Sequence, residues 1–265
     1  MIGAILGDII GSPYEFDRGS KSKDFPLFSE ESTYTDDTVM TLAVAKAFLE
    51  AQPDAADDLI LKNLADSMRQ FGKMYPYAGY GGRFRLWLRN PEAKAYYSFG
   101  NGAAMRVSPV GWWCQEQEAV LEQARETAIF SHNHPEGIKG AQTVAYAIWF
   151  LRHTKDLAAF RRNIDAIYPG FMRDYPVGVF DETCQGTVPV ACKIICEASS
   201  FEDAIRRAIL QGGDSDTLGA ITGSIAEAIW EIPKEILNFV ACYLTDEMAD
   251  VVCRFYSALQ NSERY

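Results

Sequence analysis

Basic runs are absent from this 265-residue chain, whose 36 acidic residues outnumber its 25 lysines and arginines and give a formal net charge of −11. Without a basic stripe the chain offers no surface suited to neutralising the phosphates of DNA or RNA, so we expect no nucleic-acid partner. An anionic small ligand is still compatible with this charge, because bound metal ions and helix N-termini attract phosphates without basic side chains.

Long hydrophobic runs, a signal peptide and paired cysteines are also missing. The apolar N-terminus lacks a basic region and is interrupted by Asp8, and later apolar segments fall well short of the roughly 20 residues that span a bilayer. No CxxC pair occurs among the six cysteines. Cys192 and Cys196 lie one helical turn apart without other metal ligands beside them, so we interpret them as buried packing residues. These absences favour a reducing, cytoplasmic location without membrane association.

Convincing strand patterns, internal repeats and linker-like stretches are scarce as well. Apolar residues recur instead at helical spacing, as at Leu218, Ile221, Ile225 and Ile229. Only residues 177–180 leave room for very short strands. The length and the ordinary composition therefore predict a single all-α domain over residues 1–265, built from many short and medium helices.

Small residues are dense in three of the predicted helical segments, "IGAILGDIIGS", "GNGAAM" and "LGAITGSIAEA". A glycine inside a helix costs about 1 kcal/mol relative to alanine, so these segments need a compensating interaction. Close approach of one helix to another provides it. We therefore expect the three segments to cluster at the centre of the domain, where a site built from helix ends would lie.

Two similar acidic motifs open apolar helices far apart in the chain. The first, "YTDDTVM", contains Thr35, Asp36 and Asp37, and the second, "GGDSDTLG", contains Asp214, Asp216 and Thr217. Asp and Thr are favoured at helix starts, so capping explains either motif by itself. If the motifs meet in space, their four carboxylates would repel one another unless divalent cations were bound between them. Oxygen-only ligands suit a pair of Mg²⁺ or Mn²⁺ ions, and the likeness of the two motifs favours such a site.

Five segments, in this order, resemble the ADP-ribosylglycohydrolase family: "GDIIGSPYE", "YTDDTVM", "FGNGAAMRVSPVGW", "SHNHPEGIKGA" and "GGDSDTLGAITGSIAEA". The family includes dinitrogenase-reductase-activating glycohydrolase and the vertebrate ADP-ribosylhydrolases, and the resemblance runs over roughly residues 3–229. It implies an all-α fold around a central dinuclear site with two Mg²⁺ or Mn²⁺ ions. The metal ligands that it implies are Thr35, Asp36, Asp37, Asp214, Asp216 and Thr217, with Asp216 in the position that bridges the ions.

The resemblance also gives a role to Glu15, in "GSPYEF". From the residues alone, Glu15 is equally consistent with a solvated loop carboxylate. The family match places a glutamate here on a mobile flap over the metals, where it positions or activates water. We therefore expect Glu15 to be the catalytic or gating residue.

The glycine-rich turn "SFGNGAAMR" and the histidine of "SHNHPEG" are the expected substrate contacts. The substrate-binding residues that we predict are Phe99, Gly100, Asn101, Gly102 and His132. Backbone N–H groups of the turn would face a pyrophosphate, although helix packing explains the same glycines. Phe99 would contact the adenosine half, and Tyr96 and Tyr97 are equally suited to stacking or to the core. His134, before Pro135, is expected at a helix start.

Together, the motifs and the resemblance predict a metal-dependent hydrolase. It would cleave the N- or O-glycosidic bond between ADP-ribose and an acceptor, which is a modified protein side chain or a small molecule. Two alternatives stay open. One is a two-metal nucleotide phosphohydrolase, and the other is a non-catalytic ADP-ribose-binding or structural protein, because the family also contains a lens crystallin. The acceptor, the choice between the two metals and the oligomeric state are left open by these motifs.

Overall fold

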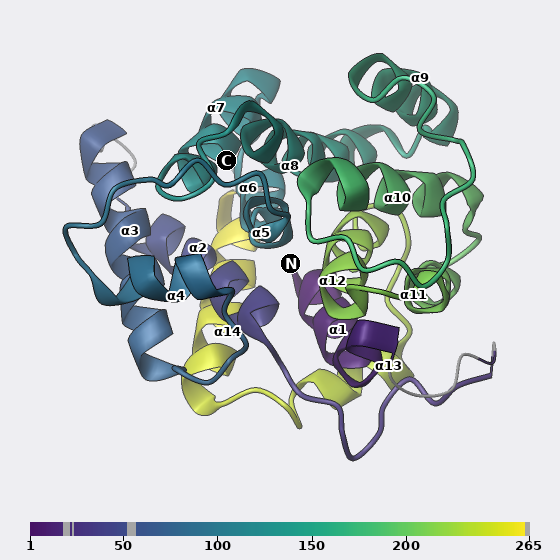
Figure 1. The fold of residues 1–265 in the computed structure, drawn as a ribbon, viewed down its shortest axis with the longest axis horizontal. Helices are drawn as coiled ribbons and strands as arrows, with labels where there is room; N and C mark the ends of the chain where they lie inside the picture. Colours follow the sequence, from purple (N-terminus) through teal and green to yellow (C-terminus); the bar gives the residue numbers. More distant parts are fainter. Residues whose placement is uncertain (18–21, 23, 52–56, 263–265) are drawn as a thin grey trace.

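The computed structural model describes residues 1–17, 22, 24–51 and 57–262, and the regular structure in these ranges is helical (Figure 1). In chain order the elements are α1 (Ile2–Gly11), the irregular 3-10 segment η1 (Ser12–Asp17), α2 (Asp36–Glu50), α3 (Asp57–Met74), α4 (Gly82–Arg89), α5 (Gly102–Met105), α6 (Ser108–Trp113), α7 (Gln117–Ile129), α8 (Pro135–Thr154), α9 (Leu157–Ile167), α10 (Cys184–Glu197), α11 (Phe201–Gln211), α12 (Ser215–Ala226), α13 (Lys234–Val240) and α14 (Asp246–Ser262). The all-α prediction is confirmed.

The structure decides one possibility that the sequence left open and corrects one predicted helix end. Residues 177–180 form a turn and coil rather than strands, and the β-type pairing seen in the described ranges is an isolated antiparallel bridge between Gly100 and Thr183. The helix predicted through Ile229 ends at Ala226, because the next amides bond three residues back: Ile229 N donates to Ala226 O at 3.1 Å. This tighter pattern ends the α-helix one turn early.

Helices α1 and α12 lie side by side at the centre of the molecule, with the other helices arranged around them (Figure 1). A Cβ atom added to Gly7 would lie 2.0 Å from the backbone oxygen of Gly219, and one added to Gly3 would lie 2.1 Å from that of Gly223. The two backbones are therefore in direct contact, which only glycine permits at these positions. Helix α5 also packs against α12, so the predicted clustering of the three small-residue segments is confirmed.

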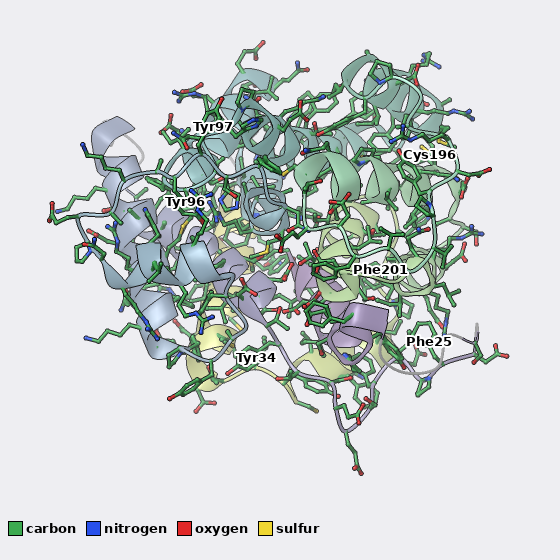
Figure 2. The ribbon with its side chains drawn as sticks, in the orientation of Figure 1. Phe25, Tyr34, Tyr96, Tyr97, Cys196 and Phe201 are labelled. Atoms are coloured by element: carbon green, nitrogen blue, oxygen red, sulfur yellow. The ribbon has the colours of Figure 1, made fainter. Side chains whose placement is uncertain are left out.

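Cys192 and Cys196 lie on α10, one of the helices around this centre. Cys192 is buried, and Cys196, labelled in Figure 2, is half-buried on α10; neither belongs to the two acidic clusters of the described residues. Their position agrees with packing residues rather than with metal ligands. Within the described ranges, no helix is long and apolar enough to cross a membrane.

Candidate active site

The first acidic motif is held in place by Asp8, a residue that the sequence analysis did not select. Asp8 is fully buried in the middle of α1. Its carboxylate accepts hydrogen bonds from Thr35 N at 2.9 Å and Thr35 Oγ1 at 2.7 Å, and from Thr38 N at 3.0 Å and Thr38 Oγ1 at 2.5 Å. These four donors compensate the burial of the carboxylate. The position of Asp8 inside an apolar helix was the signal that could have identified it from the sequence, because a buried carboxylate needs buried hydrogen-bond partners.

At the start of α2, Thr35 is the N-cap, and its hydroxyl oxygen accepts a hydrogen bond from Asp37 N at 3.3 Å. Asp37 is 2% exposed. Its Oδ2 accepts a bond from Thr217 Oγ1 at 3.1 Å, whereas its Oδ1 is buried without a hydrogen-bond partner among the described residues. A buried, unpartnered carboxylate oxygen is costly unless a cation neutralises it.

The second motif follows a tight turn made by Gly212 and Gly213, whose φ angles of 76° and 77° glycine adopts without strain. Asp214 occupies the N-cap position of α12 but makes no side-chain cap bond. Its Oδ2 instead accepts a hydrogen bond from Asn101 Nδ2 at 2.6 Å. Asp216 Oδ1 accepts a bond from Thr217 N at 2.9 Å, inside the first turn of the helix.

The two motifs meet, as their likeness suggested. One carboxylate oxygen from each of Asp8, Asp37 and Asp216 lies within 4.8 Å of the others, and the same holds for Glu15, Asp214 and Asp216. Asp216 belongs to both groups. The remaining predicted ligand with a carboxylate, Asp36, lines the cavity beside them. Two oxygen-rich clusters that share one aspartate have the chemistry of a site for two hard divalent cations.

Crowding and burial perturb these carboxyl groups strongly. Burial, with the nearby carboxylates of Asp8 and Asp214 as the next causes, raises the pKa of Asp36 to about 8. Burial also raises the pKa values of Asp37 and Asp216 well above the ordinary range, again with neighbouring carboxylates as the second cause. Perturbed carboxyl groups gathered at one cavity are typical of functional sites.

A cavity of about 440 Å³ opens beside the carboxylate clusters, large enough for a small-molecule ligand. Its lining includes the acidic residues Glu15, Asp36, Asp214 and Asp216 and the basic residues Arg83, Arg106 and His132. Gly100, Asn101, Gly102 and Thr217 line it too. Four of the six predicted ligands and four of the five predicted substrate contacts therefore line one cavity, whereas Thr35 and Asp37 are not among its lining residues.

Phe99 is the exception among the predicted substrate contacts. Its side chain is 45% exposed, is not among the cavity-lining residues and packs edge-on against His134 at 5.3 Å between ring centroids. Tyr96 lines the cavity, whereas the exposed ring of Tyr97 also packs against His134; Figure 2 shows both tyrosines on the segment that precedes α5. His134 itself caps α8, since its Nδ1 accepts a bond from Glu136 N at 3.1 Å, which confirms the predicted helix start.

His132 is buried against the glycine-rich turn. A Cβ atom on Gly102 would lie 3.1 Å from His132 Nε2, so glycine leaves the space that the ring occupies. Ser131 Oγ lies 2.7 Å from His132 Nδ1 and also accepts a bond from Arg106 Nη2 at 3.2 Å. Burial lowers the pKa of His132 well below its ordinary value, with Arg106 as a second cause, so the imidazole is neutral at physiological pH.

Glu15 is held over the second motif by its neighbours in the chain. Ser215 Oγ donates to Tyr14 O at 3.1 Å, and Phe16 N donates to Gly213 O at 2.8 Å. Phe16 adopts a left-handed φ of 58°, and its ring stacks on Phe180 at 4.8 Å. This strained residue next to Glu15 is the kind of backbone feature that accumulates at functional sites.

Comparisons with known proteins show which proteins the chain is similar to. A model of the ADP-ribosylglycohydrolase family matches residues 1–264. The ADP-ribosyl-(dinitrogen reductase) glycohydrolase of Rhodospirillum rubrum is 24% identical over 256 residues, covering 87% of this chain and 84% of the relative. ADP-ribosylhydrolase ARH3 of Danio rerio is 25% identical, with 97% of this chain and 88% of the relative covered. A solved structure described as an ADP-ribosylglycohydrolase-related protein complex has the same fold, with a TM-score of 0.70 at 23% identity, covering 97% of this chain and 95% of that one.

Proposed function

Because the chain belongs to the ADP-ribosylglycohydrolase family, we propose that it hydrolyses the bond between the anomeric carbon of ADP-ribose and an N or O atom of an acceptor. The acceptor is a modified protein side chain or a small molecule, and free ADP-ribose is released. The observation that carries the proposal is the meeting of two carboxylate clusters at one cavity, with Asp216 common to both.

The residues fit two hard divalent cations, Mg²⁺ or Mn²⁺. All candidate donors are oxygen atoms, and Asp37 Oδ1 is buried without a partner among the residues described. We assign the ligands to Thr35, Asp36, Asp37, Asp214, Asp216 and Thr217. Asp8 anchors the Thr35 segment through four hydrogen bonds, three to Oδ2 and one to Oδ1, and its carboxylate also belongs to the cluster with Asp37 and Asp216. Ions bound there would lower the pKa of a water molecule and orient the sugar hydroxyls.

In this proposal Glu15 is the residue that gives or takes the proton transferred during hydrolysis. Its carboxylate oxygen lies within 4.8 Å of those of Asp214 and Asp216, and its backbone neighbours are bonded to Gly213 and Ser215. A carboxylate held at that place can exchange a proton with the attacking water or with the departing acceptor. His132 and the Gly100–Gly102 turn line the same cavity and would bind the ADP-ribose moiety.

The test is to incubate the purified protein with a panel of ADP-ribosylated arginine, serine, nucleobase and small-molecule substrates, with and without EDTA, and to identify the products by mass spectrometry. Intact ADP-ribose that disappears with EDTA supports the proposal. AMP plus ribose phosphate would instead identify a phosphohydrolase. Tight binding of ADP-ribose without any product would identify a binding protein.

Glu15→Gln then tests the proton-transfer role. Glutamine preserves the shape of the side chain but cannot exchange a proton at neutral pH. We expect kcat to fall by roughly 10²–10⁴-fold while the affinity for ADP-ribose changes only a few-fold. Glu31→Gln, at an exposed position on the connection between η1 and α2, is the matched control and should turn over normally. A wild-type rate for Glu15→Gln would show that Glu15 is only a loop carboxylate.

A further inference from the structure

The segment of residues 176–180 is bonded to the end of α11. It belongs to the long connection between α9 and α10, which runs past α11 and α12 (Figure 1). Gln211 Nε2 donates a hydrogen bond to Pro176 O at 2.8 Å, and Gly178 N donates to Gln211 O, also at 2.8 Å. Because both bonds go to Gln211, the 176–180 segment has a fixed place beside the last residue of α11.

Backbone packing ties the same segment to the second acidic motif. A Cβ atom added to Gly213 would lie 2.3 Å from the backbone oxygen of Val179. The two main chains are therefore in direct contact, which glycine permits at this position because it has no side chain. Asp214 follows Gly213 directly, so the 176–180 segment lies against the turn that carries one of the carboxylates of the site.

Two aromatic rings join the 176–180 segment to the segment that carries Glu15. Phe180 and Phe16 stack with 4.8 Å between their ring centroids and an interplanar angle of 26°. Both residues line the cavity, and they are 42% and 57% exposed. An aromatic pair is favourable beyond the apolar area that it buries. A stack between two rings that are otherwise this exposed therefore stabilises the position of one segment relative to the other.

The stack lies where the backbone of the Glu15 segment is strained. Glu15 has ordinary angles, with φ −54° and ψ 142°, whereas Phe16 has left-handed ones, with φ 58° and ψ 32°. This conformation is unfavourable for a residue other than glycine, so it needs compensating contacts. Two such contacts are the bond from Phe16 N to Gly213 O, at 2.8 Å, and the stack on Phe180. Loss of the stack would therefore loosen the residue next to Glu15.

We propose that Phe180 is a positioning residue for hydrolysis, which holds the Glu15 carboxylate over the second acidic motif through its stack on Phe16. The inference rests on the proposed function, since that function makes Glu15 the residue that exchanges a proton. Phe180 acts on the reaction only through the Glu15 segment. Because the 176–180 segment is itself bonded to Gln211, the support of Glu15 extends to α11.

The first experiment compares Phe180→Ala with Phe180→Tyr, using the ADP-ribosylated substrate that the wild-type protein hydrolyses fastest. In Phe180→Ala, kcat should fall by about 10-fold, because a small displacement of a catalytic group is costly. The affinities for metal and for ADP-ribose, measured by calorimetry, should change less than about two-fold, since no binding group is removed. Phe180→Tyr keeps the ring and should restore most of the rate.

Val177→Ala is the matched control. The Val177 side chain lies on the same segment, is 66% exposed and does not line the cavity, so this variant should turn over like the wild type. Weaker binding of ADP-ribose by Phe180→Ala with an unchanged kcat would show that Phe180 contacts the ligand itself, and would overturn the positioning role.

A double-mutant cycle tests whether Phe180 acts through Glu15. In the Glu15→Gln background, Phe180→Ala should lower the remaining rate less than about two-fold, because the group that it positions has already lost its function. A further loss of about 10-fold in that background would show an effect independent of Glu15 and would overturn the proposal.

Limited proteolysis tests the positioning without any catalysis. Cleavage by chymotrypsin after Phe16, identified by mass spectrometry, should be about 3–10-fold faster in Phe180→Ala than in the wild type, the factor expected for loss of an aromatic pair. Val177→Ala should be cleaved at the wild-type rate. Unchanged cleavage and unchanged kcat in Phe180→Ala would overturn the positioning role and leave the proposed function intact. A wild-type protein that hydrolyses no ADP-ribosylated substrate would overturn the proposed function, and the positioning role with it.

Discussion

The two acidic motifs begin their helices in different ways. In α2 the N-cap is Thr35, whose hydroxyl accepts the cap bond and leaves the carboxylate of Asp36 facing the cavity. In α12 the N-cap is Asp214, which makes no side-chain cap bond and directs its carboxylate to Asn101. Capping preferences thus explain the residue types at both helix starts but not the orientation of Asp214. Asp214 stands at the N-cap position but makes no cap bond. This feature indicates more strongly than the residue types do that the carboxylates of the second motif serve the site.

Removing one carboxylate from either motif should have the largest effect. Asp37→Asn and Asp214→Asn should each weaken Mg²⁺ or Mn²⁺ binding by more than about 100-fold and abolish hydrolysis, because loss of an outer partner alone typically costs 10–100-fold. The helical circular dichroism spectrum should stay unchanged, since Asn is an acceptable residue at a helix start. Calorimetry with the metal and the ADP-ribose assay measure the effects.

The control for this pair is Asp203→Asn, which changes an aspartate in the first turn of α11, outside the site. It should bind metal and turn over like the wild type. Full activity in the combined Asp37→Asn and Asp214→Asn variant would mean that both motifs are only helix caps.

Widening the contact between α1 and α12 should disturb both motifs at once. In Gly7→Ala the new Cβ meets the backbone of Gly219, which cannot yield as a side chain would, so we expect a loss of stability near the upper end of the roughly 1–3 kcal/mol typical of overpacking. Asp8 is the next residue on α1, so metal affinity should fall too. Gly82→Ala, where a Cβ meets nothing within 4 Å, should leave the thermal midpoint nearly unchanged. A normal midpoint for Gly7→Ala would contradict the contact.

The raised carboxyl pKa values predict how metal and pH act on stability. A carboxyl group whose folded pKa lies above its unfolded value binds more protons in the folded state, so stability falls as pH rises through that interval. With Asp36 raised from 3.8 to about 8, the metal-free protein should become more stable as pH falls from about 8 toward 5. Saturating metal at a hundredfold excess over Kd should add about 2.7 kcal/mol at neutral pH and flatten this dependence. Melting curves in EDTA and in Mg²⁺ across this pH range test both statements, and identical curves would contradict them.

The smallest expected change in stability distinguishes the N-cap residues of the two motifs, Thr35 and Asp214. In EDTA, Thr35→Ala should destabilise the protein by about 1 kcal/mol, because the cap bond to Asp37 N is lost. Asp214→Asn should cost nothing or stabilise the metal-free protein, because Asp214 makes no cap bond and its charge is repelled by its neighbours. Thr35→Ser keeps the hydroxyl and serves as the control. Equal losses of stability in the Thr35→Ala and Asp214→Asn variants would contradict the difference between the two N-cap residues.

Local signals in the sequence were sufficient for the helical class and for the meeting of the two motifs. Glycine spacing predicted the central helix contacts, because glycine destabilises a helix and is usually retained there where two helices pack closely. Asp8 and Arg106 were missed because their partners, Thr35, Thr38 and Ser131, reach them only through the tertiary fold.

The sequence also did not predict which side chains before the glycine-rich turn point into the cavity. Tyr97 adopts a left-handed φ of 56°, which changes the side to which the following residues point. As a result Tyr96 lines the cavity whereas Phe99 packs outside it, against His134. Residue types alone carry no signal for such a single backbone reversal.

The bonds on either side of Glu15 have a consequence for exchange with solvent. Phe16 N is bonded to Gly213 O and Tyr14 O to Ser215 Oγ, so lifting Glu15 away from the site requires both links to break together. The Phe16 amide should therefore exchange its hydrogen for deuterium only when the segment detaches from the start of α12. The exchange rate of the Phe16 amide therefore measures how often the site opens, in the intact protein and without any substrate.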